Sequence, residues 1–365
     1  DDELAQILLS PDSPVWFHKR RLYFYLDRQN KDSFRGLLGT LDSIAVAAPK
    51  AADRAMVMVD KSEITEPVIF QRGDPSQPGS PVPRRFLQFL SKPDHSPFSN
   101  GAGRLELADA IADPSNPLTP RVWANRVWMH HFGSPLVEDP SDLGLRNDLP
   151  LQHHLLDYLA SYLIKNNYQT KPLHRLILSS DAFQRSSLIT DDERLQQQLN
   201  SDPQNNYYWR FNRRRLDLEQ MRDTLLTISG LLDDTMFGRP VAITADNNNR
   251  RTIYAFVERQ NLPTIIQVFD AANADSSTSR RPSTTVPQQA LFALNSPFIH
   301  RMATALTKRI DSDNKVEQVT YLYELTYGRV PTTEELTLGT TFLQTNEILD
   351  YAQVLLISNE LWFVD

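Results

Sequence analysis

The sequence predicts a mostly α-helical fold with a few short β-strands, arranged as a multi-helix globular core. Apolar residues recur three or four positions apart along most of the chain, which is the period of an α-helix with one buried face. Stretches rich in β-branched and aromatic residues are few and short. With 365 residues, 40% of them hydrophobic, the chain is long enough for two or three domains or lobes.

The first 104 residues divide into two regions. Residues 1–65 are predicted to be an N-terminal helical segment, or the end of a preceding domain, because apolar residues follow helical spacing through residues 3–47. Residues 66–104 are predicted to hold a short strand at Val68–Phe70, followed by a turn and a Pro-rich loop.

Residues 105–365 are predicted to form the main helical domain, with a strand and a polar loop at residues 250–285. The strand is placed at Thr252–Glu258, which has the strongest β-branched and aromatic character in the chain. Helices are indicated by capping residues and amphipathic stripes. In chain order these signals are Thr119 as an N-cap before Pro120, residues 151–163, Thr170 as a cap, residues 213–232, Ser296 before Pro297, and the pair Thr332 and Glu335.

Composition excludes several classes of function. A net charge of −7 argues against a nucleic-acid partner, because nucleic-acid-binding domains present excess positive charge. The chain has no cysteine, so neither a thiolate metal site nor covalent attachment of haem c is expected, and no cofactor is assigned to the chain itself. No apolar run approaches the ~20 residues of a transmembrane segment.

The segment Asn116–Gly133 is dense in tryptophan and histidine. His130 and His131 are adjacent, so on a helix they point about 100° apart and cannot both bind one ion. The favoured interpretation is a packed aromatic helix around Trp123 and Trp128. A metal or redox contact at His130, His131, Asp139 and Asp142 remains a weaker alternative, because the two acidic residues also suit turns and caps.

The densest group of polar residues lies at positions 270–295 and is the main candidate for a ligand site. Arginines beside carboxylate and amide side chains suit an anionic or hydroxyl-rich ligand. We expect Asp270, Arg280, Arg281 and Gln289 to converge on one concave site. The full candidate set is Asp270, Asp275, Arg280, Arg281, Gln289, Asn295 and Arg214. A salt-bridge network that holds a long loop is an equally good interpretation, and no residue is assigned a catalytic role.

Several of these motifs resemble a known family. The segments RGDPSQPGSPVP, NPLTPRVWANRVWMHHFG, KPLHRLILSSDAFQRSS and NNYYWRFNRRRLDLEQMRD are similar to signatures of a planctomycete-type domain of unknown function. That domain is the C-terminal member of a pair found on large exported proteins that also carry a cytochrome c-like module. The chain departs from the family at Gln152–His154, where the family usually has His-Pro-Glu.

The resemblance implies an exported protein of the periplasm or cell envelope. It implies as partners the companion N-terminal domain, a cytochrome c-like module, or both, with haem c on that partner domain or chain. Roles in polysaccharide use or electron transfer follow from the same resemblance.

Three hypotheses for function follow. In the leading one, the chain is an exported module of a cytochrome-associated protein that binds an anionic or hydroxyl-rich ligand such as an acidic polysaccharide, while redox chemistry takes place on a partner. In the alternative, it is a structural or interaction subunit of an envelope or redox assembly without a ligand site. A third and weaker hypothesis is a hydrolase that uses the carboxylates of residues 270–275.

Overall fold

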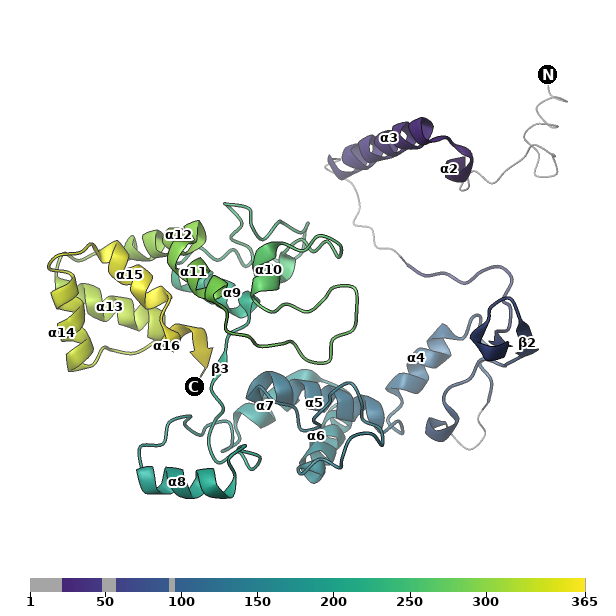
Figure 1. Ribbon diagram of the computed structural model, residues 1–365, viewed down its shortest axis with the longest axis horizontal. Coiled ribbons are helices and arrows are strands. Elements are labelled where there is room, and N and C mark those ends of the chain that lie inside the picture. The colour runs from purple at the N-terminus through teal and green to yellow at the C-terminus, as the bar shows by residue number, and fades with distance from the viewer. Residues whose placement is uncertain (1–21, 48–56, 92–95, 365) are drawn as a thin grey trace. The chain divides into compact units, whose positions relative to one another are not determined.

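The computed structural model describes residues 22–47, 57–91 and 96–364 (Figure 1). The chain forms two compact units, Asp1–Gly79 and Ser80–Asp365, and each is considered by itself. The described residues are mostly helical with a few short strands, which confirms the predicted fold class. The parts of the predicted helical segment at residues 3–21 and 48–56 lie outside the described residues.

The N-terminal unit contains the helices α2 (Leu22–Tyr25) and α3 (Arg28–Ala47). Strand β1 (Val68–Phe70) forms where the sequence predicts it, and it pairs with β2 (Pro78–Pro81). Between the strands comes the short 3-10 helix η2 (Gln71–Gly73). The turn that follows is held by Asp74, whose carboxylate accepts hydrogen bonds from the backbone and hydroxyl of Ser76 at 2.9 and 2.7 Å.

The first helices of the C-terminal unit are the 3-10 helix η3 (Gln88–Leu90) and α4 (Arg104–Ala112), which follow the last two residues of β2. A first lobe then forms from α5 (Leu118–Phe132), α6 (His153–Lys165) and α7 (Thr170–Leu178) (Figure 1). Trp128 and Phe132 stack in its core with ring centroids 4.0 Å apart. They pack with buried aliphatic residues of the other two helices, including Leu163, Leu173 and Ile177.

The predicted N-cap at Thr119 is wrong by two residues. The helix α5 begins at Leu118, whose backbone N–H donates to the side chain of Asn116 at 3.1 Å. The Thr119 hydroxyl instead donates to the carbonyl of Ile111 at 2.6 Å, so it ties α5 to the end of α4. Thr170 is likewise the first residue of α7 and not its cap, which is Gln169.

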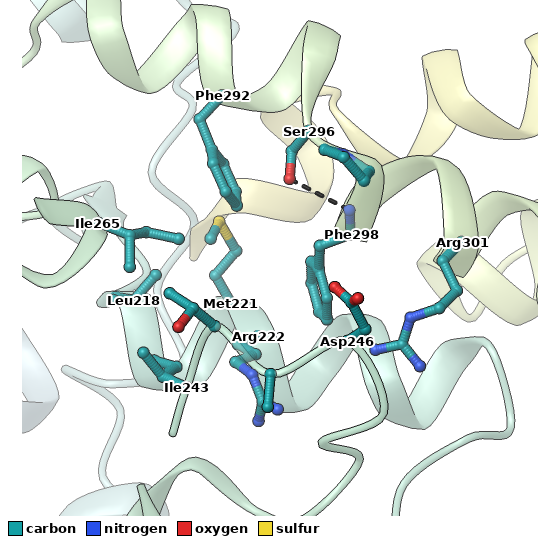
Figure 2. A pocket seen from close by; sticks show the side chains of 13 residues that line it. Leu218, Met221, Arg222, Ile243, Asp246, Ile265, Phe292, Ser296, Phe298 and Arg301 are labelled. Atoms are coloured by element: carbon teal, nitrogen blue, oxygen red, sulfur yellow. Dashed lines mark hydrogen bonds between the residues drawn. The ribbon is translucent and has the colours of Figure 1, made fainter. Parts of the chain in front are cut away.

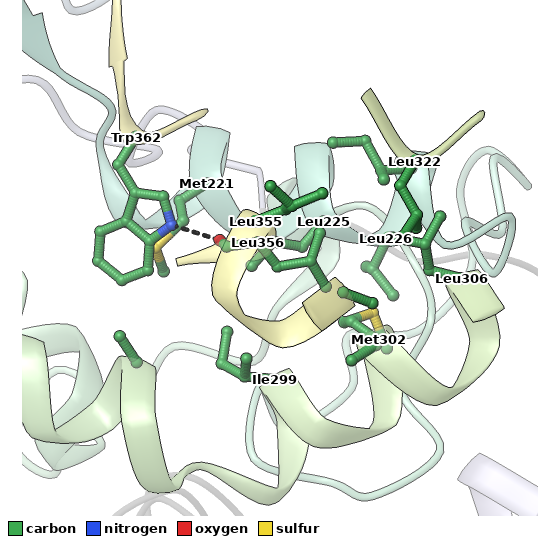
Figure 3. Packing of buried hydrophobic residues seen from close by; sticks show 14 of the residues in the cluster. Met221, Leu225, Leu226, Ile299, Met302, Leu306, Leu322, Leu355, Leu356 and Trp362 are labelled. Carbon is green, nitrogen blue, oxygen red and sulfur yellow. Dashed lines mark hydrogen bonds between the residues drawn. The ribbon is translucent and has the colours of Figure 1, made fainter. Parts of the chain in front are cut away.

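The second lobe contains the helices from α9 (Leu218–Ile228) to α16 (Asn359–Trp362) and has a larger core (Figures 1 and 3). Its helix α12 begins after the predicted cap Ser296, and the predicted capping box of Thr332 and Glu335 is present. Figure 3 shows side chains of α9, α12, α13 and α15 packed together, with the Trp362 indole N–H donating to the Leu356 carbonyl at 2.8 Å. The elements from the first lobe onward are α8 (Asp192–Ser201), β3 (Arg214–Arg215), α9 (Leu218–Ile228), η4 (Thr252–Tyr254), α10 (Thr264–Val268), α11 (Pro287–Asn295), α12 (Pro297–Thr307), α13 (Lys315–Tyr327), α14 (Thr333–Phe342), α15 (Ile348–Leu356), α16 (Asn359–Trp362) and β4 (Phe363–Val364).

The predicted helix over 213–232 is wrong at its start. Arg214 and Arg215 form β3, which pairs antiparallel with Val364 and Phe363 at the far end of the sequence. Val364 packs against the core of the first lobe and Phe363 against the core of the second. The β3–β4 pair therefore joins the two lobes, and α9 begins only at Leu218.

The predicted strand at Thr252–Glu258 is also wrong. Thr252 starts the 3-10 helix η4, and the Asp223 carboxylate accepts hydrogen bonds from its backbone N–H at 2.8 Å and its hydroxyl at 2.6 Å. Ala255 makes only an isolated bridge to Val241. Tertiary hydrogen bonds therefore override the local preference for a strand. Each helix in the described part of the chain is too short or too polar to span a membrane.

We expect the substitution Trp128→Ala to lower the free energy of unfolding by about 3–5 kcal/mol, the usual range for deleting a buried aromatic side chain. Trp128 is 4% exposed, and its indole N–H donates to the Tyr208 hydroxyl at 2.9 Å. The prediction that Trp123 packs in the core is wrong, because Trp123 is 46% exposed. Trp123→Ala on the same helix is therefore the matched control. Urea denaturation followed by circular dichroism measures both, and equal losses would contradict this description of the core.

Candidate ligand-binding site

Asp270 is the centre of the polar group that the sequence marks as a site. Its carboxylate accepts hydrogen bonds from the Arg215 guanidinium at 2.9 Å, from the Thr284 backbone at 2.9 Å and from the Thr284 hydroxyl at 2.6 Å. Gln289 is buried beside them, accepts a hydrogen bond from Arg215 and donates to the Val268 carbonyl at 2.9 Å. The Arg215 and Asp270 side chains are only 13% and 11% exposed.

The electrostatics of Asp270 are those of a structural carboxylate. Burial by itself would raise its pKa, but the hydrogen bonds from Thr284 and the charge of Arg215 outweigh burial and lower the pKa below its usual value. The backbone is left-handed here, with φ of 60°, which aspartate tolerates better than most residues. Because its oxygens are already engaged, Asp270 anchors the loop between α10 and α11 and offers little to a ligand or to acid–base chemistry.

The other candidate residues between positions 270 and 295 do not take part in the Asp270 network. Arg281 makes a bidentate ion pair with Glu219 at 2.9 and 2.8 Å. Asp275 is exposed, and Asn295 lies at the end of α11, where its amide donates to the Leu291 carbonyl at 3.1 Å. The structure thus brings Asp270 and Gln289 together around Arg215, and it places Arg281 and Arg280 apart from them.

Arg280 reaches a polar groove of about 470 Å³ in the C-terminal unit. The groove is lined by the segments that connect α5 to α6, by the turn after α8 and by Arg280 from the polar loop. Its polar side chains include Glu138, Asp148, Gln152 and Arg280. Glu138 and Asp148 make no hydrogen bond within the part of the chain that the structure describes, and Arg280 makes only a 3.4 Å contact to the Gly133 carbonyl. This groove therefore has unused hydrogen-bonding capacity, unlike the Asp270 network.

His131 of α5 and His174 of α7 form a pair between the two helices. The His131 Nε2 lies 2.7 Å from the His174 Nδ1, so one ring donates a hydrogen bond to the other. Burial, and then the neighbouring His174, Arg214 and His130, lower the pKa of His131. Arg214 packs against Gly133 on the same side, and its buried Nε has no hydrogen-bond partner among the described residues.

The acidic residues after α5 form turns. Asp139 accepts hydrogen bonds from the Ser141 backbone and hydroxyl at 2.9 and 2.6 Å, and these bonds lower its pKa. Asp142 accepts one from the Gly144 backbone at 2.8 Å and pairs with Arg146. Among the described residues, no group of three or more His, Cys, Asp or Glu side chains could hold a metal ion.

A second cavity, of about 590 Å³, was not predicted from the sequence (Figure 2). Its walls are mostly apolar and come from α9, the segment 243–246, α10 and the α11–α12 junction. Thr244, Ala245 and Asp246 in its lining are exposed, so the cavity opens to solvent and a ligand can enter it. Because its lining residues lie in separate segments of the sequence, no local motif marks it.

The chain belongs to a family of domains of unknown function. The family model for PSD1, described as a protein of unknown function (DUF1553), matches residues 103–343. That range contains most of both lobes, the Asp270 network and every residue that lines the two cavities. No curated protein and no solved structure matches the chain.

We expect Asp270→Asn to lower the free energy of unfolding by about 3–5 kcal/mol, because it leaves the Arg215 guanidinium buried without a counter-charge. The control is Asp275→Asn, an exposed aspartate of the same loop, for which a change within about 0.5 kcal/mol is expected. Urea denaturation at pH 7 measures both variants. If both variants match the wild type, the network does not anchor the loop.

We expect the free energy of unfolding to fall as the pH is lowered through about 6.5, partly because of His131. The folded-state pKa of His131 lies below its usual value of 6.5, so the unfolded chain takes up a proton that the folded chain does not. The stabilisation is complete above pH 6.5 and is lost as the pH falls through the folded-state pKa. His131→Gln should flatten this dependence in denaturation curves measured from pH 8 to pH 5.

The exposed His300 provides the control for that series. His300→Gln should leave the pH dependence of the wild type intact. A His131→Gln curve that runs parallel to the wild-type curve would show that the histidine pair does not carry the effect.

Proposed function

We propose that this chain is the ligand-binding module of an exported, cytochrome-associated multidomain protein or complex, and that it binds a hydroxyl-rich ligand, namely a polysaccharide. The groove that Arg280 enters carries this proposal. It offers two carboxylates and a guanidinium whose hydrogen-bonding capacity is largely unused within the described residues. Beside them lies the Gln152 amide, which donates one hydrogen bond to the Asn206 carbonyl at 3.2 Å. Sugar hydroxyls both donate and accept hydrogen bonds, so they suit a site that contains acceptors and donors together.

The apolar surface of the groove supports the same class of ligand. Leu149 and Leu151 line it and are largely exposed, so the C–H faces of a sugar ring could pack on them. With Glu138 and Asp148 facing one arginine, the groove favours a neutral or weakly acidic chain over a densely anionic one. Of the two ligand classes that the sequence predicts, anionic and hydroxyl-rich, the groove therefore favours the hydroxyl-rich one.

The proposed location is the periplasm or cell envelope, and the proposed partners are the companion domain and a cytochrome c-like module. Without cysteine, the chain has no thiol for attaching haem c, so we assign redox chemistry to the partner domain or chain. The resemblance of the sequence motifs to planctomycete-type domains supports this setting.

Binding to soluble polysaccharides tests the proposal. In isothermal titration calorimetry against oligosaccharides of xylan, mannan, β-glucan and polygalacturonate, we expect at least one neutral oligosaccharide to bind. Arg280→Ala and the double substitution Glu138→Gln with Asp148→Asn should each weaken that binding by about 10-fold or more, since each removes hydrogen bonds to the ligand. The melting temperature should stay within a degree or two of the wild type, because these side chains are exposed.

The control is Asp275→Asn, which changes an exposed carboxylate of the same loop outside the groove. It should bind the oligosaccharide as the wild type does. Equal affinity for wild type and groove variants, or no binding of any oligosaccharide in the series, would reject the groove as a saccharide site.

An interaction subunit without a ligand site is the second candidate. Helix α3 favours it, because Leu37, Leu41 and Ile44 are 68%, 65% and 67% exposed at helical spacing, which is typical of a face that packs against another surface. This alternative predicts that the same titrations show no saccharide binding.

A further inference from the structure

The second cavity of the C-terminal unit combines an apolar interior with a charged mouth. Figure 2 shows Leu218, Ile243, Ile265 and Phe292 on one side and Asp246 and Arg301 on the other. Leu218 and Ile243 are buried residues of the main core, so the apolar wall is a continuation of that core. A ligand here would place an apolar body against the core and a polar head at the mouth.

Phe298 stands between two arginines at this mouth. The guanidinium carbons of Arg222 and Arg301 lie 5.7 and 5.6 Å from its ring centroid. Phe298 is the second residue of α12, and its backbone N–H donates to the Ser296 hydroxyl at 3.2 Å, so the cap holds the backbone at this point. Both guanidinium groups therefore lie against the same aromatic ring in the lining of this cavity.

The two arginines differ in how much of their donor capacity is used. Arg222 is 4% exposed and donates to the Arg250 carbonyl at 2.8 Å, to the Thr252 hydroxyl at 3.1 Å and to the Asn248 carbonyl. Its Nε is buried and has no hydrogen-bond partner among the described residues. Arg301 is half-buried, and toward the described residues it donates a single side-chain hydrogen bond, to the Asn249 side chain at 2.7 Å. A guanidinium offers five donors, so Arg301 can still bind a carboxylate through two of them.

We propose that this cavity is a binding site for a small organic monocarboxylate with an apolar body. The carboxylate pairs with Arg301 at the mouth, beside Phe298, and the apolar body fills the space against Leu218 and Phe292. A monoanion fits better than a dianion, because the Asp246 carboxylate also lines the cavity and the Asp223 carboxylate lies 3.7 Å from Arg222. This site is separate from the proposed saccharide groove, and neither depends on the other.

Isothermal titration calorimetry with octanoate, below its micelle concentration, tests the proposal on the whole chain. We expect one octanoate per chain, bound about 100-fold more tightly than butyrate, because four further CH₂ groups enter an apolar space. 1-Octanol should bind about 10-fold more weakly than octanoate, and octylamine should not bind, since the mouth selects an anion.

Two variants locate the bound molecule. Arg301→Gln should weaken octanoate binding by about 10-fold and leave 1-octanol binding unchanged, because only the carboxylate head loses its partner. Ala245→Phe, which narrows the cavity at its rim, should weaken both probes. The control is Arg251→Gln, an exposed arginine outside the cavity, and it should change neither.

Three outcomes would overturn the proposal. The absence of octanoate binding to the wild type would mean that the cavity holds only solvent. Equal affinity for octanoate and 1-octanol, or preference for octylamine, would show that the mouth does not select an anion. Equal losses in Arg301→Gln and Arg251→Gln would place the bound octanoate outside the cavity.

Discussion

The buried ion pair between Arg215 and Asp270 is the contact on which the arrangement of the C-terminal unit depends. Arg215 belongs to β3, which pairs with β4 at the joint between the two lobes. Asp270 starts the loop that carries Arg280 and Arg281. Removing both charges from water is costly. The hydrogen bonds that Thr284 donates to Asp270, and the one that Arg215 donates to the buried Gln289, offset that cost. The pair thus fixes the base of the loop and the joint together.

Arginine performs the same structural task elsewhere in this unit. Arg222 holds the segment 248–252 through backbone carbonyls, and Arg329 binds the carboxylates of Glu335 and Glu360 at distances of 2.7–2.8 Å. The guanidinium suits this role because its planar donors fit carbonyl and carboxylate oxygens in fixed geometry. Only nine of the 38 basic residues other than histidine are lysines, in keeping with this use. Arg280 and Arg301 differ from these structural arginines because they line cavities and keep unused donors. They are therefore the arginines that point to ligand sites.

Elements decided by neighbouring residues could be predicted from the sequence, whereas elements decided by distant partners could not. Strand β1, the Ser296 cap and the Thr332–Glu335 capping box form as predicted, because each depends on partners nearby in the sequence. Asp223, about thirty residues away, removes the predicted strand at Thr252. Within the site, Arg215 and not the predicted Arg214 reaches Asp270, because successive strand residues point to opposite faces.

Both cavities are lined by segments that buried hydrogen-bond networks anchor. Arg280 enters the groove from a loop whose base is Asp270, and the segment that lines the second cavity leads into residues held by Arg222. Substitution of Asp270 or Arg222 would therefore displace side chains that line a cavity, although neither residue would contact a ligand there through its anchoring groups. A binding defect therefore identifies a ligand-contacting residue only when the free energy of unfolding is unchanged. Substitutions of exposed side chains with unused hydrogen-bond donors meet that condition. Substitutions of buried side chains whose donors are all engaged do not.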